Sequence, residues 1–219
     1  MKALCTFAAG DGYRRLLGLT GPRMAAYAAR HGYDLIRPEP GEDLYEVLAE
    51  ANGDRPPSWM KIALANVLLN TYQQVLWLDA DVVVCDDTLD VADQVADDAW
   101  QAMVAHHTGD GEVPNCGVWL LRPAMQPALR QVWTMSQYNH DGWYEQAAVV
   151  ELLGYERAPA RLLEPTDLYR HTHWLPLEWN SHEQNDPHPS PRFAHATCGD
   201  LAWREQVIRH HLERSPVNA

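Results

Sequence analysis

The amino-acid sequence predicts one α/β domain with a mainly parallel central sheet. Segments typical of strands and of helices alternate through the first half of the chain, which is the order found in parallel sheets. A length of 219 residues suits a single sizeable domain. Apolar residues make up 46% of the chain, which excludes a disordered polymer. We therefore expect residues 1–219 to fold as one unit.

Two strands and a helix are expected at the start of the chain. Residues 1–9 form a short apolar run that Asp11 soon follows, so a buried strand fits better than a signal peptide. Proline and glycine at its boundaries predict a helix over residues 23–30, and residues 33–36 read as the next strand. This strand–helix–strand unit should be right-handed.

The same order continues downstream. Ser58 is placed to cap a helix through Leu69, and a strand follows directly. Further short strands are expected over residues 103–105 and 117–121, and helices over residues 128–137 and 145–153. An acidic segment follows the strand that contains Asp79 and Asp81. It is interpreted as the solvated face of a helix, with Asp86, Asp87, Asp90, Asp93, Asp97 and Asp98.

The segment from residue 159 to residue 192 is rich in proline, which prevents long regular elements. Its tryptophans argue against a bare linker. We therefore expect a structured loop region over a binding cleft.

Charge and hydropathy exclude several partners. The formal net charge is −13 and the basic residues form no long cluster, which argues against nucleic acid or an anionic membrane. No segment approaches the roughly 20 apolar residues that cross a bilayer. We expect a soluble, cytoplasmic protein without membrane insertion. The cysteines form no CxxC pair, so reduced and mostly buried thiols are expected rather than a zinc site, at Cys5, Cys85, Cys116 and Cys198.

Two carboxylates, Asp79 and Asp81, interrupt the apolar run over residues 75–84. In an extended chain their side chains point to one side, close enough to share a cation. Hard cations such as Mg²⁺ and Mn²⁺ prefer oxygen ligands, and ligands of open α/β sheets bind beyond the carboxyl ends of strands. The pair therefore predicts a metal site that could hold a phosphate-bearing ligand. The alternative is that Asp79 caps a turn and Asp81 pairs with an arginine.

Seven pieces of sequence, in order, resemble one known family. These are residues 27–35, 58–61, 77–81 and 115–122, then Glu145-Gln146, Trp179-Asn180 and His195. Together they resemble the family 34 galactosyltransferases, which include xyloglucan xylosyltransferases and belong to the GT-A superfamily. The resemblance spans about residues 5–199. It implies a single GT-A (Rossmann-like) nucleotide-sugar glycosyltransferase domain.

The resemblance assigns metal and donor-diphosphate binding to Asp79 and Asp81, with Mn²⁺ or Mg²⁺ as the cofactor. His195 resembles the late histidine that completes the metal shell, although residues 195–199 depart from the usual spacing. Lys61 matches a lysine near the donor phosphates, where its charge would offset the leaving group. An ordinary exposed helix lysine is the alternative.

Other matched positions surround the transferred sugar and the nucleotide. Asn115, Gly117, Glu145 and Gln146 match the sugar and the reaction centre, and Asn180 is a weaker match near the sugar. Gly117 either allows close backbone approach or forms a β-bulge. The base and ribose are expected after the first strand, near Thr6, Ala8 and Tyr13, where Tyr13 either stacks or packs. Candidate acceptor contacts that could instead pin the loop region are His173, Trp174 and Trp179.

The implied activity is metal-dependent transfer of a hexose or pentose from a nucleoside-diphosphate sugar, a UDP-sugar by superfamily usage, to an acceptor hydroxyl with retention. Retention needs either Glu145 as a nucleophile or same-face attack with the leaving phosphate taking the proton; we favour the second. The expected acceptor is a small soluble molecule or an intermediate. Two other classes stay open: a sugar-phosphate nucleotidyltransferase and a non-catalytic sugar-nucleotide-binding protein.

Overall fold

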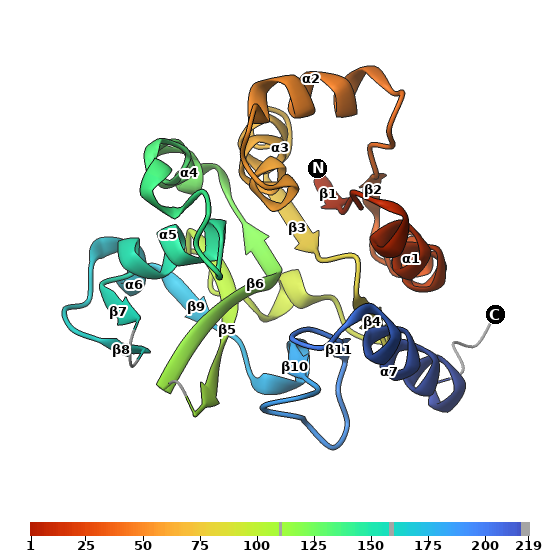
Figure 1. The fold of residues 1–219 in the computed structure, drawn as a ribbon. Helices are drawn as coiled ribbons and strands as arrows, with labels where there is room; N and C mark the ends of the chain where they lie inside the picture. The colour runs from red at the N-terminus through yellow and green to blue at the C-terminus, as the bar shows by residue number, and fades with distance from the viewer. Residues whose placement is uncertain (110, 158–159, 216–219) are drawn as a thin grey trace.

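The computed structural model describes residues 1–109, 111–157 and 160–215, with helices on both sides of a central sheet (Figure 1). The helices are α1 (Asp11–His31), α2 (Asp43–Asn52), α3 (Met60–Leu68), α4 (Gln126–Thr134), α5 (Glu145–Leu152), α6 (Asp167–Arg170) and α7 (Leu201–Arg214). The strands are β1 (Lys2–Cys5), β2 (Tyr33–Ile36), β3 (Gln74–Leu78), β4 (Val82–Val84), β5 (Gln101–Thr108), β6 (Gly111–Leu121), β7 (Tyr155–Arg157), β8 (Ala160–Leu162), β9 (Thr172–Trp174), β10 (Ser181–His182) and β11 (Phe193–His195).

The central sheet is mainly parallel, as the sequence predicts. Its strands follow the order β2-β1-β3-β6-β5-β9, and β8 joins β7 to β6. The parallel pairs are β1 with β2, β1 with β3, β5 with β9 and β6 with β8. Strand β6 runs antiparallel to both β3 and β5. Because β1 and β3 are parallel neighbours, their carboxyl ends meet at one edge of the sheet.

A small second sheet brings the end of the chain to that edge. Its order is β10-β11-β4, and β11 lies antiparallel to β4 with His195 opposite Val82. The backbone N–H of Ala196 donates to the carbonyl of Asp81 at 3.1 Å. This pairing holds His195 beside the segment that follows β3, far from it in sequence.

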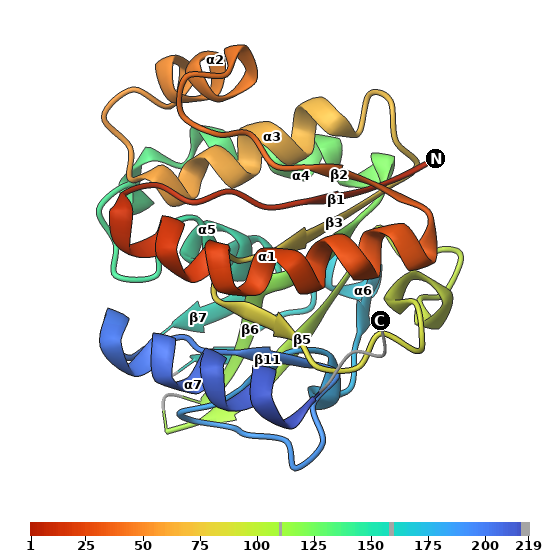
Figure 2. The ribbon, with the colours of Figure 1, turned by 90° about the vertical axis from the view of Figure 1, so that its right-hand side faces the viewer.

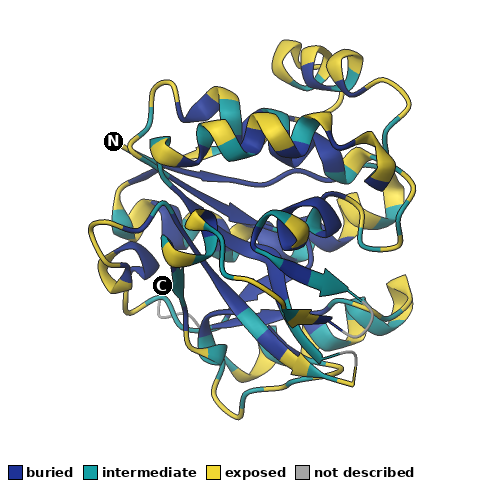
Figure 3. Cartoon of the chain, turned by 90° about the vertical axis from the view of Figure 1, so that its left-hand side faces the viewer, coloured by how far each residue is buried: buried dark blue, intermediate teal, exposed yellow. Residues whose placement is uncertain are grey.

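Two apolar cores lie on opposite faces of the central sheet. Helices α3, α4 and α5 cover one face, where Trp59 and Trp119 are fully buried. Helix α1 and the small sheet cover the other, where Tyr27 packs on Phe193. Helix α7 runs alongside α1 (Figure 2) and buries Ile208. The strands between these layers are mostly buried, while the outer faces of the helices are exposed (Figure 3).

The first helix is longer than the boundary signals predicted. It begins at Asp11 and continues through Pro22 to His31. Pro22 cannot donate to the carbonyl of Gly18, but Gly18 is exposed, so water can hydrate that carbonyl. Gly32 ends the helix in a left-handed conformation with φ 69°, as expected.

The sequence predicts Ser58 as the cap of α3, and this prediction is wrong. A 3-10 turn over Pro57–Trp59 leads into α3, and no side chain caps either start. The buried hydroxyl of Ser58 has no hydrogen-bond partner among the described residues. Proline at the start of the turn presets the backbone, so no side-chain cap is needed.

The acidic segment is not a helix face. It is irregular apart from a short 3-10 turn over Val91–Gln94. Asp90 is buried; it pairs with Lys2 at 2.6 Å and accepts hydrogen bonds from Tyr27 and Tyr33 at 3.2 and 2.6 Å. Partners from distant strands and helices thus neutralise a charge that the local pattern assigned to solvent.

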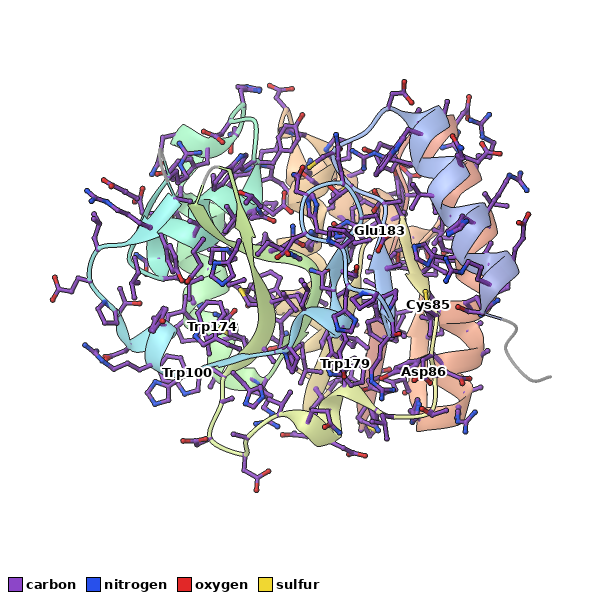
Figure 4. All side chains as sticks on the ribbon, turned by 90° about the horizontal axis from the view of Figure 1, so that it is seen from below. Cys85, Asp86, Trp100, Trp174, Trp179 and Glu183 are labelled. Atoms are coloured by element: carbon purple, nitrogen blue, oxygen red, sulfur yellow. The ribbon has the colours of Figure 1, made fainter. Side chains whose placement is uncertain are left out.

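The proline-rich segment carries only short elements from Ala160 onward, whereas Pro159 lies outside the described residues. Trp174 lies 5.2 Å from Tyr169 between ring centroids, and Trp179 is buried 5.4 Å from Phe193 (Figure 4). The first contact lies within the segment, whereas the second contact and the pairing of β9 with β5 hold the segment against the body of the protein.

No helix among the described residues is long and apolar enough to cross a bilayer. All four cysteines are free, as expected, but only Cys5 and Cys116 are buried; Cys85 is partly exposed and Cys198 is exposed. The position of Cys198 in a loop after β11 accounts for its exposure.

Candidate functional site

A cleft of about 520 Å³ opens where β1 and β3 end. Its walls come from the residues after β1, the turn after β3, the middle of β6, the start of α5 and the segment after β11. This is the edge at which open α/β sheets bind ligands.

Asp79 and Asp81 lie in a turn rather than in the extended strand that the sequence predicted. Strand β3 ends at Leu78, and the N–H of Val82 donates back to the carbonyl of Asp79 at 3.0 Å. The N–H of Asp79 is held by the carbonyl of Gly117 at 2.8 Å. The turn changes the local geometry, yet both carboxylates still line the cleft.

His195 completes a cluster with the two aspartates. One ligand atom from each of the three residues lies within 4.8 Å of the others. The Nε2 atom of His195 is 3.3 Å from Asp81 Oδ1 and 3.8 Å from Asp79 Oδ2. The other carboxylate oxygens are already engaged, Asp79 Oδ1 by Lys61 at 2.9 Å and Asp81 Oδ2 by Arg204. Two oxygens and one nitrogen therefore converge, which fits a divalent metal ion with room for further ligands.

Arg204 was missed by the sequence reasoning, although an arginine partner for Asp81 was the stated alternative. It lies on α7, donates to Gly199 O at 2.8 Å and sits 5.6 Å over the ring of Tyr13. Burial alone would raise the pKa of Asp81, but His195 and Arg204 hold it below its usual value. Only the docking of α7 against α1 brings this arginine to the cleft, so the sequence carried no local signal.

Lys61 is buried and directed at protein groups. Its ammonium lies 2.9 Å from both Asp79 Oδ1 and Glu145 Oε1, donates to Cys116 O at 3.3 Å, and sits 5.2 Å from the Trp77 ring. Burial alone would lower the pKa of Lys61, but the two carboxylates raise it, so the group stays charged. All three ammonium hydrogens have protein acceptors. Lys61 therefore forms ion pairs with two carboxylates at once, and the alternative of an exposed lysine is wrong.

The start of α5 presents Glu145 and Gln146 to the cleft. Glu145 is buried, and its Oε2 has no hydrogen-bond partner among the described residues. Gln146 Oε1 accepts from the N–H of Cys116 at 3.2 Å. Asn115 also lines the cleft. The structure thus brings together Asn115, Glu145 and Gln146, which the resemblance assigned to the sugar and the reaction centre.

Gly117 leaves space for His195. A Cβ atom on Gly117 would lie 2.1 Å from His195 Cε1 and 2.9 Å from Asn115 Oδ1. Gly117 also falls in the stretch of β6 where the register with β5 shifts, near Ala102 and Val104. Close approach and an irregular strand therefore occur together at this glycine.

The expected nucleotide end is only partly assembled in the cleft. Ala8 and Tyr13 line it, whereas Thr6 is buried outside the lining. His173, Trp174 and Trp179, the expected acceptor contacts, also lie outside the lining.

Two buried histidines that the sequence reasoning missed line the cleft near His195. Burial lowers the pKa of His106 to about 3; burial and the charge of His195 lower that of His182 to about 4. Both rings are therefore neutral near pH 7. Both nitrogens of His106 and Nδ1 of His182 lack hydrogen-bond partners among the described residues, while His182 Nε2 lies 3.4 Å from Cys198 Sγ. A neutral imidazole offers one donor and one acceptor, which suits hydroxyl groups.

The fold and the cleft define a GT-A nucleotide-sugar transferase. The family model described as nucleotide-diphospho-sugar transferase matches residues 56–201, more than half of the chain. The chain belongs to this family, and it is a glycosyltransferase of the nucleotide-diphospho-sugar type. No curated protein sequence matches it.

Solved structures share the GT-A fold at low identity. A glycosyltransferase involved in the glycosylation of the major capsid of PBCV-1 has a TM-score of 0.63 and 18% identity, covering 95% of this chain and 98% of that one. GlyE of Streptococcus pneumoniae has a TM-score of 0.62 and 14% identity, covering all of this chain and 62% of that one. The galactosyltransferase LgtC, in complex with donor and acceptor sugar analogues, has a TM-score of 0.57 and 14% identity, covering 99% and 97%. At these identities the likeness concerns the fold.

Proposed function

We propose that the chain is a divalent-metal-dependent glycosyltransferase that moves a hexose or pentose from a UDP-sugar to an acceptor hydroxyl with retention. The observation that carries this proposal is the convergence of Asp79 Oδ2, Asp81 Oδ1 and His195 Nε2 at the cleft. Mn²⁺ or Mg²⁺ suits two hard oxygen ligands and an imidazole. The resemblance to family 34 supports galactose, glucose or xylose as the transferred sugar.

The donor diphosphate is proposed to lie between the metal site and Arg204. Lys61 has no hydrogen left for a phosphate, so Arg204 is the cation of the described lining that can still supply a donor. Its planar guanidinium presents five N–H donors, of which one contacts Asp81 and another Gly199. Tyr13, whose ring lies 5.6 Å from this guanidinium, is proposed to contact the nucleotide.

A bound divalent ion would stabilise the negative charge that grows on the departing diphosphate. Asn115 Oδ1 accepts from Gly117 and Asn180, so Asn115 has only its Nδ2 to offer to the sugar. Lys61 holds Glu145 Oε1, while Oε2 has no hydrogen-bond partner among the described residues. We favour same-face attack, in which the donor phosphate takes the acceptor proton. A Glu145→Gln variant that keeps most of its transfer activity would exclude a covalent intermediate.

The acceptor is proposed to be a small soluble molecule or a biosynthetic intermediate that presents hydroxyl groups. The neutral rings of His106 and His182 in the cleft lining support a hydroxyl-bearing rather than a charged acceptor.

Thermal unfolding with a panel of nucleotide sugars, each with and without Mn²⁺, tests this function. A ligand that binds the native state raises the Tm according to its occupancy. We expect a UDP-sugar to give a Mn²⁺-dependent rise that Asp79→Asn and Asp81→Asn remove. Slow release of UDP from the same donor would separate an enzyme from a binding protein. The absence of a Mn²⁺-dependent shift with every nucleotide sugar would overturn the proposal.

A further inference from the structure

A chain of hydrogen bonds connects the backbone of β6 to the ring of His195. The N–H of Gly117 donates to Asn115 Oδ1 at 2.8 Å, and Asn180 Nδ2 donates to the same oxygen at 2.9 Å. Asn180 Oδ1 lies 3.1 Å from His195 Nδ1. Asn180 is 0% and His195 2% exposed. The central residue of the chain, Asn180, is therefore shielded from water, whereas Asn115 and His195 also line the cleft.

The direction of each bond follows from its first donor. A backbone N–H can only donate, so the atom of Asn115 that faces Gly117 must be the amide oxygen. That oxygen can only accept, so Asn180 must turn its NH₂ group toward it. The remaining atom of Asn180, its oxygen, then faces His195 and can only accept. The hydrogen between Asn180 and His195 must therefore reside on Nδ1 of the imidazole.

We infer that Asn180 is a positioning residue that holds His195 as the Nδ1–H tautomer, which leaves the Nε2 lone pair available to a metal ion shared with Asp79 and Asp81. The inference rests on the proposed metal site. The opposite tautomer would place an N–H where the metal ligand atom must be, and it would set the lone pairs of Nδ1 and Asn180 Oδ1 against each other. Groups that fix the tautomer of a ligating histidine commonly change metal affinity by about 10- to 100-fold.

The same geometry explains two other residues of the site. Asn115 Oδ1 accepts hydrogen bonds from the Gly117 N–H and from Asn180 Nδ2. It thereby orients the Asn180 amide so that the amide oxygen faces His195. The space left by Gly117 admits the His195 ring, since a Cβ there would lie 2.5 Å from Nδ1. Both residues thus support the ligand before any sugar binds.

Asn180→Leu and Asn180→Asp are the test variants. Leucine removes the acceptor, whereas a buried aspartic acid in its protonated form can donate its O–H to Asn115 Oδ1 and still accept from Nδ1–H. Gln101 is the matched control, because it is another buried amide bonded at both ends, to Trp119 at 2.7 Å and Thr172 at 2.8 Å. Gln101→Leu should lower stability without changing metal affinity.

Nitrogen NMR of the histidine rings and Mn²⁺ calorimetry supply two readouts. The His195 signal, assigned with a His195→Gln sample, should report Nδ1–H in the metal-free and the Mg²⁺-loaded wild type. We expect Mn²⁺ affinity to fall about 10- to 100-fold in Asn180→Leu and to stay within about threefold of wild type in Asn180→Asp.

An Nε2–H tautomer in the wild-type protein would overturn the inference, as would equal losses of Mn²⁺ affinity in the leucine and aspartate variants. If the wild type bound no Mn²⁺, the proposed metal site would fail. The tautomer of the metal-free protein would still decide whether Asn180 sets the state of His195.

Discussion

Lys61 and Glu145 form a buried ion pair, with 2.9 Å between Nζ and Oε1. The same ammonium reaches Asp79 Oδ1 at 2.9 Å, so one cation joins a proposed metal ligand to the carboxylate at the start of α5. Because the Lys61 and Glu145 side chains are each only 5% exposed, water cannot replace either partner. Lys61 thus fixes the spacing between the carboxylates of Asp79 and Glu145.

Lys61→Met is expected to lower the free energy of unfolding by about 3–5 kcal/mol, because it leaves the buried carboxylate of Glu145 without a counter-charge. Urea denaturation measures the loss. The double variant Lys61→Met with Glu145→Gln should recover part of it, since one unpaired charge is then removed. A loss below about 1 kcal/mol, as for an exposed pair, would show that the buried ion pair of Lys61 and Glu145 does not form.

Gly117→Ala is expected to weaken Mn²⁺ binding by at least about tenfold, because the added methyl group overlaps the His195 ring. Calorimetry of Mn²⁺ in the absence of nucleotide measures this effect directly. Gly18→Ala is the matched control, because Gly18 lies exposed in α1 with nothing within 4 Å of an added Cβ. It should raise stability by about 0.5–1 kcal/mol and leave Mn²⁺ binding unchanged. Equal Mn²⁺ affinities in both variants would contradict the account.

Arg204→Gln is expected to weaken the binding of Mn²⁺–UDP by about tenfold, because a charged hydrogen bond to the diphosphate is lost. The binding of Mn²⁺ alone should change less. Arg209→Gln, on the same helix, is the control, because Arg209 is exposed and pairs with Glu205 at 2.8 Å, away from the cleft. The role of Arg204 is refuted if both variants bind UDP as tightly as the wild type.

His211 gives the protein a pH dependence on the alkaline side. Burial alone would lower the pKa of His211, but Cys85 and Glu183 (Figure 4) raise it to about 9. The unfolded histidine titrates near 6.5, so this contribution is complete below about pH 6.5 and is lost as pH rises through about 9. Glu183 Oε2 lies 2.9 Å from His211 Nε2 and, together with Cys85, accounts for the gain.

The expected consequence is a loss of a few degrees of Tm between pH 6.5 and pH 9.5 that His211→Gln does not share. Thermal unfolding across this range measures the difference between the two proteins. Parallel curves for the wild type and the variant would show that the ion pair contributes nothing.

The sequence was sufficient for the fold class and for the short motifs near the sheet edge. Strand and helix signals are local, and Asp79, Asp81 and Glu145 lie at ends of elements that periodicity can find. The hydrogen-bond and ion-pair partners of these side chains were harder to predict, because they depend on tertiary contacts. Nothing near Lys61 in sequence indicates that its charge faces Glu145.

Long-range packing also explains two of the errors. Asp90 reads as one of many surface acids, but Lys2 on the first strand neutralises it. Pro22 reads as a helix start, but an exposed carbonyl four residues earlier lets α1 continue. Arg204 reaches Asp81 only because α7 folds back over α1. The errors at Asp90 and Arg204 concern contacts between residues that are distant in sequence, whereas the one at Pro22 is local.

The most direct test of the central claim is calorimetric titration of UDP and GDP into wild-type protein and Asp81→Asn, with Mn²⁺ and with EDTA. We predict that one nucleotide, UDP, binds the wild type at least about tenfold more tightly with Mn²⁺, and that Asp81→Asn loses this gain. Equal binding with Mn²⁺ and EDTA, or no binding of either nucleotide, would contradict a metal site that holds the donor diphosphate.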